Sequence, residues 1–351
     1  MSNMISYVPP IVLAFLVIGL GCYIGKIKVC RMSLDLAGVL ILAVAAGALL
    51  VGAGLEKDVA HSASLKTFLK NLSTLGMAMF VSTIGLTTGY SMNRNFRIRN
   101  LSYFCAGILA VLAGFGVMKG IGMVDRKISH SALLGILCGS LTSTPGMAAA
   151  CEMRDVLAEE VILGYGCAYV FGVVFVVLFV QLLMRKEKNM CLGSITPEKN
   201  RVNTKAACTE SLTQIGAAVA LGTILGNLPL PMGASLGATG GMLCTGILEG
   251  MLVRRIEPHR VPDSQSMSLY RNTGLVFFFA GSGIPAGMQF GEAFEVRWLL
   301  YGMLLTLVPI LTCYIWGKLQ KLCNARTACV VAGGMTSTPA MGVLLEMEGE
   351  M

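Results

Sequence analysis

The sequence predicts an all-α membrane protein made of two inverted-topology repeats, each with a proline-broken, re-entrant helix. Three observations predict this fold. Of the 351 residues, 55% are hydrophobic and only 13% are charged, whereas a soluble domain carries about 25% charged residues. Long apolar runs recur along the chain. The stretch "LTSTPGM" at 141–147 returns as "MTSTPAM" at 335–341.

A helix that crosses a bilayer needs about 20 mostly apolar residues. Nine runs meet this condition, and we expect each to be a spanning helix: 8–25, 34–54, 71–90, 101–119, 161–184, 211–227, 232–252, 272–289 and 298–317. Two further segments, 130–151 and 325–346, are apolar but interrupted by Gly, Ser, Thr and Pro. Each contains one copy of the Thr-Ser-Thr-Pro quartet, and we expect these two to be broken helices.

Basic residues in the loops indicate the direction of each span. They follow the first, third and fifth runs: Lys26, Lys28, Arg31, Arg94, Arg97, Arg99, Arg185, Lys186 and Lys188. Positive loops stay in the cytoplasm, so the N-terminus is expected outside the cell, in an inner-membrane protein. The third cluster is cytoplasmic only if segment 130–151 dips into the bilayer and returns on the same side.

Three blocks of the first half recur in the second half in the same order. "GCYIGKIKVCRMSLDLAG" aligns with "LGTILGNLPLPMGASLGATG", "LGMAMFVSTIGLTTGYSM" with "TGLVFFFAGSGIPAGMQF", and "GSLTSTPGMAAACEM" with "GGMTSTPAMGVLLEM". Chance similarity between glycine-rich helices is the alternative, and three collinear blocks argue against it. We therefore expect repeat 1 at 1–184, a cytoplasmic linker at 185–209 and repeat 2 at 210–351. The halves enter the membrane from opposite sides, which is typical of secondary transporters with a midplane substrate site.

Proline breaks a helix because it lacks an N–H and clashes with the preceding turn. Unpaired backbone in a bilayer is tolerated only beside protein or a water-filled cavity, and the N-terminus of a half-helix starting at the proline suits an anion. We therefore expect two sets of substrate-binding residues: Thr142, Ser143, Thr144 and Pro145, and Thr336, Ser337, Thr338 and Pro339. Hinge glycines are expected beside them: Gly139, Gly146, Gly333 and Gly334. The alternative is that the hydroxyls bond only to their own helix.

Arg271, in "LYRNTGLVFF", begins the span at 272–289. Its guanidinium could donate two parallel hydrogen bonds to a carboxylate. Alternatively, it is an ordinary flanking charge that extends from the helix end. The 12 cysteines include no Cys-x-x-Cys pair and there are only 3 histidines, so no metal and no cofactor are expected. The net charge of +8 lies in loops between apolar runs, which orients spans in a lipid bilayer and requires no nucleic acid.

The blocks "GSLTSTPGM" and "GGMTSTPAM", with "GCYIGKIK" and "GLVFFFAGSG", resemble the aspartate–alanine exchanger family of bacterial permeases. The resemblance implies a secondary carrier rather than an enzyme. It would exchange a small anionic substrate, such as aspartate, alanine or a dicarboxylate, by moving one repeat against the other around the quartets. Carriers of this type are often homodimers.

Two departures from the family pattern leave alternatives open. Regulatory domains usual between the halves have no room in the short linker, and the second repeat stops at Met351 without the helix that follows the first quartet. A truncated, non-transporting remnant is therefore one alternative. A membrane subunit of an ion-pumping decarboxylase is another, although no acidic residue lies deep within an expected span, as such a subunit requires.

Overall fold

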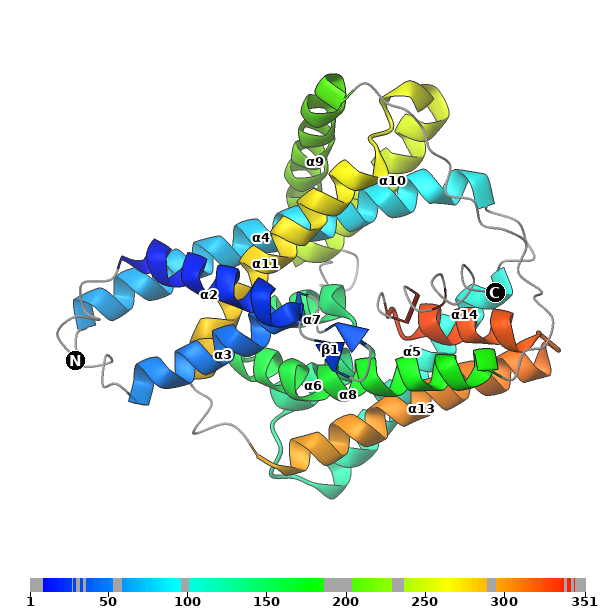
Figure 1. Ribbon diagram of the computed structural model, residues 1–351, viewed down its shortest axis with the longest axis horizontal. Coiled ribbons are helices and arrows are strands. Elements are labelled where there is room, and N and C mark those ends of the chain that lie inside the picture. Colours follow the sequence, from blue (N-terminus) through cyan, green and yellow to red (C-terminus); the bar gives the residue numbers. More distant parts are fainter. Residues whose placement is uncertain are drawn as a thin grey trace. The chain divides into compact units, whose positions relative to one another are not determined.

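A computed structural model describes residues 9–26, 28–29, 32–33, 36–52, 59–95, 101–185, 204–228, 237–288, 295–337, 340–341 and 344. Helices make up nearly all of these residues (Figure 1). The one sheet among them pairs β1 (Lys28–Val29) with β2 (Met32–Ser33), antiparallel. The chain divides into two compact units, and each unit takes segments from both halves of the sequence.

The first unit comprises residues 1–96, 152–155 and 199–293. Its helices are α2 (Pro10–Gly25), α3 (Ala37–Gly52), α4 (Val59–Asn95), α9 (Thr204–Gly226), α10 (Gly237–Ile256) and α11 (Ser264–Met288), with a short 3-10 turn, η3 (Pro258–Arg260). The long helix α4 packs against both α10 and α11, and α11 also packs against α3. Figure 1 shows α4 and α11 lying along one another.

Glycines bring α4 and α11 into backbone contact. A Cβ on Gly76 would lie 2.6 Å from the carbonyl oxygen of Gly274, and a Cβ on Gly274 would lie 2.8 Å from that of Gly76. Further along, Gly281 faces Ser73. Residue numbers therefore rise along one helix as they fall along the other, so the two helices run antiparallel, as the loop charges predict.

Two other helix pairs in this unit run parallel and share one contact geometry. A Cβ on Gly89 of α4 would lie 2.9 Å from the Cα of Gly250 on α10, and a Cβ on Gly47 of α3 would lie 2.9 Å from the Cα of Gly287 on α11. Close approach through small residues is how membrane helices associate, because lipid provides no hydrophobic drive between them.

The second unit comprises residues 97–151, 156–198 and 294–351. Its helices are α5 (Leu101–Val124), α6 (His130–Ser140), α7 (Thr144–Cys151), α8 (Ala158–Arg185), α13 (Arg297–Leu319) and α14 (Asn324–Gly334). Along α6 and α8, Gly135 meets Val161 and Gly139 meets Gly172, so these two helices run parallel.

The segment α6–α7 turns back on itself along α8. The Thr144 and Tyr165 hydroxyls are 2.9 Å apart, and the Cys151 thiol at the other end of α7 lies against the carbonyl oxygen of Ala158. Helix α7 therefore runs antiparallel to α8, opposite to α6. The 11 residues of α6 reach about 16 Å at 1.5 Å per residue, roughly half of a bilayer core. This is the geometry expected of a re-entrant segment.

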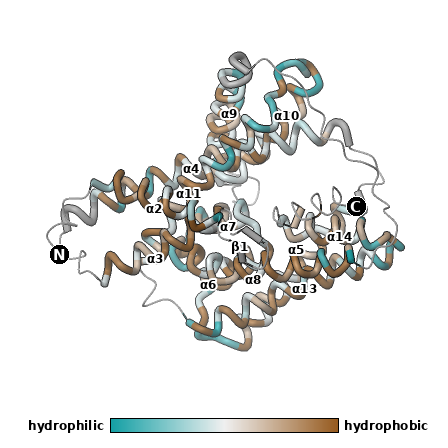
Figure 2. The backbone as a smooth tube through the Cα atoms, viewed as in Figure 1, coloured by the Kyte–Doolittle hydropathy of each residue, from teal (hydrophilic) through white to brown (hydrophobic). Residues whose placement is uncertain are grey.

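Every run expected to span the membrane contains a helix. Within the described residues, four helices are both long and apolar enough to cross a membrane by themselves: Ser64–Met92, Ser102–Val124, Ala158–Arg185 and Arg297–Leu319. Many large apolar side chains are exposed on them and on shorter helices, including Phe15, Leu20, Ile108 and Leu112, and hydrophobic residues predominate along α2, α3 and α13 (Figure 2). Exposed apolar surface of this kind is typical of a protein that lies in a membrane.

Candidate functional site at the two helix breaks

The first quartet, Thr142 to Pro145, converts the end of α6 into the start of α7. The Thr142 N–H bonds to the carbonyl of Gly139 and the Ser143 N–H to that of Cys138. These two backbone hydrogen bonds are those of a Schellman cap, in which Thr142 takes the left-handed position at φ 51°. It satisfies carbonyls that a helix end leaves without partners.

Ser143 is at the same time the N-cap of α7. Its Oγ accepts a hydrogen bond from the N–H of Gly146, at 3.2 Å, as N-cap serines do at the third residue of a helix. Pro145 is then the second residue of α7, where its absent N–H costs nothing because first-turn N–H groups have no helical partner. The helix begins at Thr144, one residue before the proline at which a start was expected.

The second quartet repeats this geometry as far as the described residues extend. The Thr336 N–H bonds to the carbonyl of Gly333 and the Ser337 N–H to that of Ala332. Thr336 has φ 49°, and the Ser337 Oγ accepts from the N–H of Ala340 at 3.4 Å. Thr338 and Pro339 lie outside the described residues.

Threonine is an unusual residue for the left-handed region, which glycine normally occupies at a helix C-terminus. A non-glycine residue there costs on the order of 1–3 kcal/mol and persists only where its surroundings hold it in place. The structure has two such threonines, Thr142 and Thr336, at matching positions.

The two threonines bond to each other's helix ends. The Thr142 hydroxyl donates to the carbonyl oxygen of Met335 at 2.7 Å, and the Thr336 hydroxyl donates to that of Leu141 at 2.9 Å. Met335 and Leu141 are the C-cap residues of α14 and α6. Each threonine therefore satisfies a carbonyl that the opposite break exposes, which a glycine could not do. The quartets, 194 residues apart in sequence, therefore meet within the second unit.

The hydroxyls of the first quartet all have protein partners. Thr142 and Thr144 are buried, the Thr144 hydroxyl pairs with that of Tyr165, and Ser143 caps α7. Thr336 is exposed. A hydroxyl that donates one bond still has lone pairs to offer, so Thr336 has the most access to a solute among the described hydroxyls of the two quartets.

The remaining predicted site residues are placed as follows. Gly139 is enclosed, since a Cβ there would lie 3.0 Å from the Cβ of Ala168, whereas a Cβ on Gly333 would meet nothing within 4 Å. Gly146 lies in the first turn of α7, and Gly334 is the last residue of α14, against the Cys313 thiol.

Arg271 belongs to the first unit, whereas both quartets belong to the second. It lies on the second turn of α11, which begins at Ser264 rather than at the arginine itself. Its guanidinium is 3.5 Å from the Ser268 hydroxyl.

Two acidic residues have notable surroundings in the first unit. The Glu152 carboxylate accepts from the Thr239 N–H at 2.9 Å and from the Thr239 hydroxyl at 2.7 Å, in the first turn of α10. Glu249 lies five residues before Arg254 on α10, but among the described residues the two form no ion pair, and Glu249 Oε2 is buried without a hydrogen bond.

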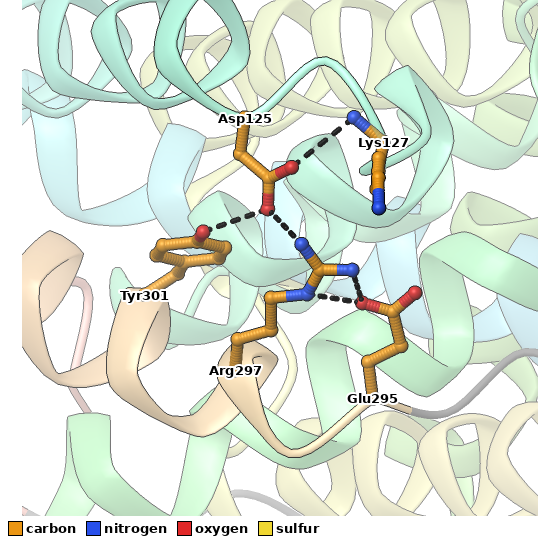
Figure 3. A network of polar contacts seen from close by, with 5 residues as sticks. All are labelled: Asp125, Lys127, Glu295, Arg297 and Tyr301. Carbon is orange, nitrogen blue, oxygen red and sulfur yellow. Dashed lines mark hydrogen bonds and ion pairs between the residues drawn. The ribbon is translucent and has the colours of Figure 1, made fainter.

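A polar network ties the end of α5 to the start of α13 (Figure 3). Asp125 accepts from Arg297 at 2.7 Å, from the Tyr301 hydroxyl at 2.8 Å and from the Lys127 N–H at 3.1 Å, and Arg297 also pairs with Glu295. The hydrogen bond from Tyr301, helped by Lys127 and Arg297, lowers the pKa of Asp125 below its usual 3.8. No signal in the sequence placed these residues together.

This chain is similar to a family of permeases and to proteins named as uncharacterized transporters. Residues 13–185 and 214–350 match the family described as "Predicted Permease Membrane Region" (Asp-Al_Ex). An uncharacterized transporter of Bacteroides thetaiotaomicron is 28% identical over 228 residues, which cover 61% of this chain and 40% of the relative. An uncharacterized transporter of Geobacter sulfurreducens is 31% identical over 225 residues, 60% of this chain and 37% of the relative. The chain thus spans about two-fifths of the length of these relatives. Because the family match covers most of its residues, the chain belongs to this family of multi-pass permease membrane regions.

Proposed function

We propose that the protein exchanges small carboxylate-bearing solutes, such as aspartate, alanine or dicarboxylates, across the bacterial inner membrane by alternating access. The observation that carries this proposal is the reciprocal pair of hydrogen bonds between the two helix breaks, from Thr142 to Met335 and from Thr336 to Leu141. Broken helices that meet are where secondary transporters bind their solutes, and membership of the permease family supports transport as the activity.

The same bonds support two repeats of inverted topology. Reciprocal contacts arise when matching segments are related by a two-fold axis. The contact between Gly76 and Gly274, at aligned positions of antiparallel helices, fits such an axis. So do the matched contacts of Gly89 with Gly250 and Gly47 with Gly287. We propose that this axis lies in the membrane plane, with the N-terminus outside and the linker at 185–209 in the cytoplasm.

Carboxylate is the favoured substrate group because of the half-helix that each quartet starts. The first turn of α7 directs its N–H groups toward the break and carries about half a positive charge. An anion can bind there without a buried lysine. The exposed Thr336 hydroxyl adds a neutral partner that serves either a carboxylate or an ammonium group, since it both donates and accepts.

Alternating access requires part of the permease to move without dismantling the site. Both quartets lie in one compact unit and bond to each other. The expected motion of one repeat against the other would break those bonds. We propose instead that the two quartets stay joined and that the second unit carries them as one body.

Exchange of labelled solute in liposomes tests the proposal. Purified protein, reconstituted with internal aspartate, alanine or succinate, should take up the same labelled solute from outside. Thr336→Val should reduce uptake about tenfold or more, because one missing polar partner in a binding site costs on the order of 1.5–3 kcal/mol.

Thr312→Val is the matched control, because among the described residues the Thr312 hydroxyl bonds to the Val308 carbonyl of its own helix, α13, and to no other group. It should exchange solute like the unmodified protein. Folded protein that exchanges none of the three solutes would refute the proposal, and so would equal loss in both variants.

A further inference from the structure

Glu249 is an acidic side chain in an apolar part of the first unit. It lies on α10, near the end of the span expected at 232–252. One of its oxygens, Oε2, is buried, and among the described residues no group donates a hydrogen bond to it. Burial of an ionised carboxylate without a donor or a cation is strongly unfavourable, whereas a protonated carboxyl is neutral and carries a proton that it can donate.

The face of α10 that carries Glu249 packs against other helices. Gly246 and Val253 lie on this face, because residues three and four apart are neighbours on a helix. A Cβ on Gly246 would lie 3.0 Å from the Ser82 carbonyl oxygen of α4, and a Cβ on Gly250 would lie 3.1 Å from the backbone nitrogen of Tyr90. Val253 packs against a cluster of buried residues: Leu86, Tyr90, Ile215, Ala218 and Met267.

A chain of hydrogen bonds beside Glu249 has a fixed direction. The Arg260 carbonyl can only accept, and it accepts from the Gln214 Nε2 at 3.1 Å. The Gln214 amide oxygen is thereby directed to Tyr90, whose hydroxyl donates its single proton to it. Glu249 is close enough to Tyr90 for its charge to act on that hydroxyl. The hydroxyl has no second proton for Glu249, but its oxygen can accept a hydrogen bond from it.

No cation pairs with Glu249 among the described residues. Helix α10 packs against α4, α9 and η3, and α11 contributes to the same apolar cluster. The described titratable and charged groups that these elements carry around this end of α10 are Tyr90, Glu210, His259, Arg260, Tyr270 and Arg271. Arg260 pairs with Glu257 at 2.8 Å and with Glu210 at 3.9 Å. Arg254 and Arg255, in the last turn of α10 itself, form no ion pair with Glu249.

We propose that Glu249 is a proton-binding site and that its protonated carboxyl donates a hydrogen bond to the Tyr90 oxygen. The chain of donors is then complete, from Glu249 through Tyr90 to the Gln214 amide oxygen. The proton comes from water and returns to water when the carboxyl ionises. With the orientation proposed above, this end of α10 faces the cytoplasm. Acidic residues in membrane spans commonly carry protons in transport, so we expect the proton to be coupled to solute exchange. That coupling rests on the proposed function, whereas the binding of the proton does not.

Reaction with dicyclohexylcarbodiimide tests the site without any transport assay. A protonated carboxyl adds across a C=N bond of the carbodiimide and rearranges to a stable N-acylurea with no atom lost, whereas an ionised carboxylate does not. The full chain in lipid vesicles is treated over a pH series, and mass spectrometry of its peptides measures the labelled fraction of Glu249. Labelling should be greatest at low pH. Above its midpoint it should fall about tenfold for each pH unit, because one proton is lost.

Glu152 is the matched control within the same protein, because its carboxylate is held by the N–H and the hydroxyl of Thr239. It should react far less than Glu249 at every pH. Tyr90→Phe removes the proposed acceptor and should move the midpoint of Glu249 labelling down by about one pH unit, because a hydrogen bond from the neutral form is lost. Tyr314→Phe, in the second unit, should leave the midpoint unchanged, and circular dichroism should show equal helix content in all variants.

Three results would overturn the proton site: no labelling of Glu249 at any pH, labelling that sodium ions abolish at constant pH, and a midpoint that Tyr90→Phe does not move. Coupling is tested separately with Glu249→Gln, which keeps the side chain neutral and should remove the pH dependence of solute exchange. A retained pH dependence would refute the coupling. Labelled protein that exchanges no solute would refute the exchange activity and leave the proton site standing.

Discussion

The two helix breaks have the same backbone and different surroundings. At the first, Thr142 is buried and Gly139 is enclosed by α8; at the second, Thr336 is exposed and Gly333 faces open space. Both nevertheless carry a left-handed threonine, a capping serine and the same pattern of backbone bonds. The backbone geometry of the break is therefore the same at both quartets, and what differs between them is the packing around it.

The largest expected difference between the breaks follows from leucine substitutions at the matched glycines. Gly139→Leu forces a side chain into backbone and should cost about 3 kcal/mol of unfolding free energy, whereas Gly333→Leu should change it by about 0.5 kcal/mol or less. Denaturant unfolding of both variants in the same detergent measures the difference. Equal destabilisation would show that the second break is enclosed as well.

The next largest difference in unfolding free energy is expected when the two threonine hydroxyls are removed one at a time. Thr142→Val leaves the Met335 carbonyl without its partner in a buried place and should cost about 1–2 kcal/mol. Thr336→Val should cost less than about 1 kcal/mol, because Thr336 is exposed and solvent or lipid headgroups can replace it. The serine variants keep the hydroxyl and serve as controls in the same unfolding assay. A larger loss for Thr336→Val than for Thr142→Val would reverse the comparison.

The capping serines should show no difference between the breaks. Ser143→Ala and Ser337→Ala each remove one N-cap hydrogen bond, which is typically worth about 1 kcal/mol. Thermal unfolding should give the same shift for both. A shift confined to Ser143→Ala would mean that the segment after Ser337 is not held by this cap.

The smallest expected effect concerns the polar network of Asp125. Because its pKa is lowered in the folded protein, the network stabilises the fold above the unfolded pKa of about 3.9. That stabilisation is lost as the pH falls through the lower, folded value. Asp125→Asn should therefore be slightly less stable than the unmodified protein at pH 7, with the gap closing below about pH 4. If the difference in stability between the two proteins persists in acid, the ionised carboxylate is not its cause.

Sequence reasoning correctly predicted a helix in every apolar run that was expected to span the membrane. It could have gone further at the breaks, because a serine followed two residues later by a proline is a helix-start signal. It did not show that Glu152 caps α10 through Thr239, or that Asp125 joins Arg297. Those pairs are 87 and 172 residues apart, and no local pattern specifies a single long-range polar contact.

The sequence by itself determined which segments form apolar helices and where α6 ends, because helix formation and a proline act through the nearest few residues. Only the tertiary structure decided that two threonines take the left-handed conformation and cap each other's helix ends. That conformation is unfavourable for each threonine alone, and it persists because the opposite break supplies the carbonyl that its hydroxyl needs.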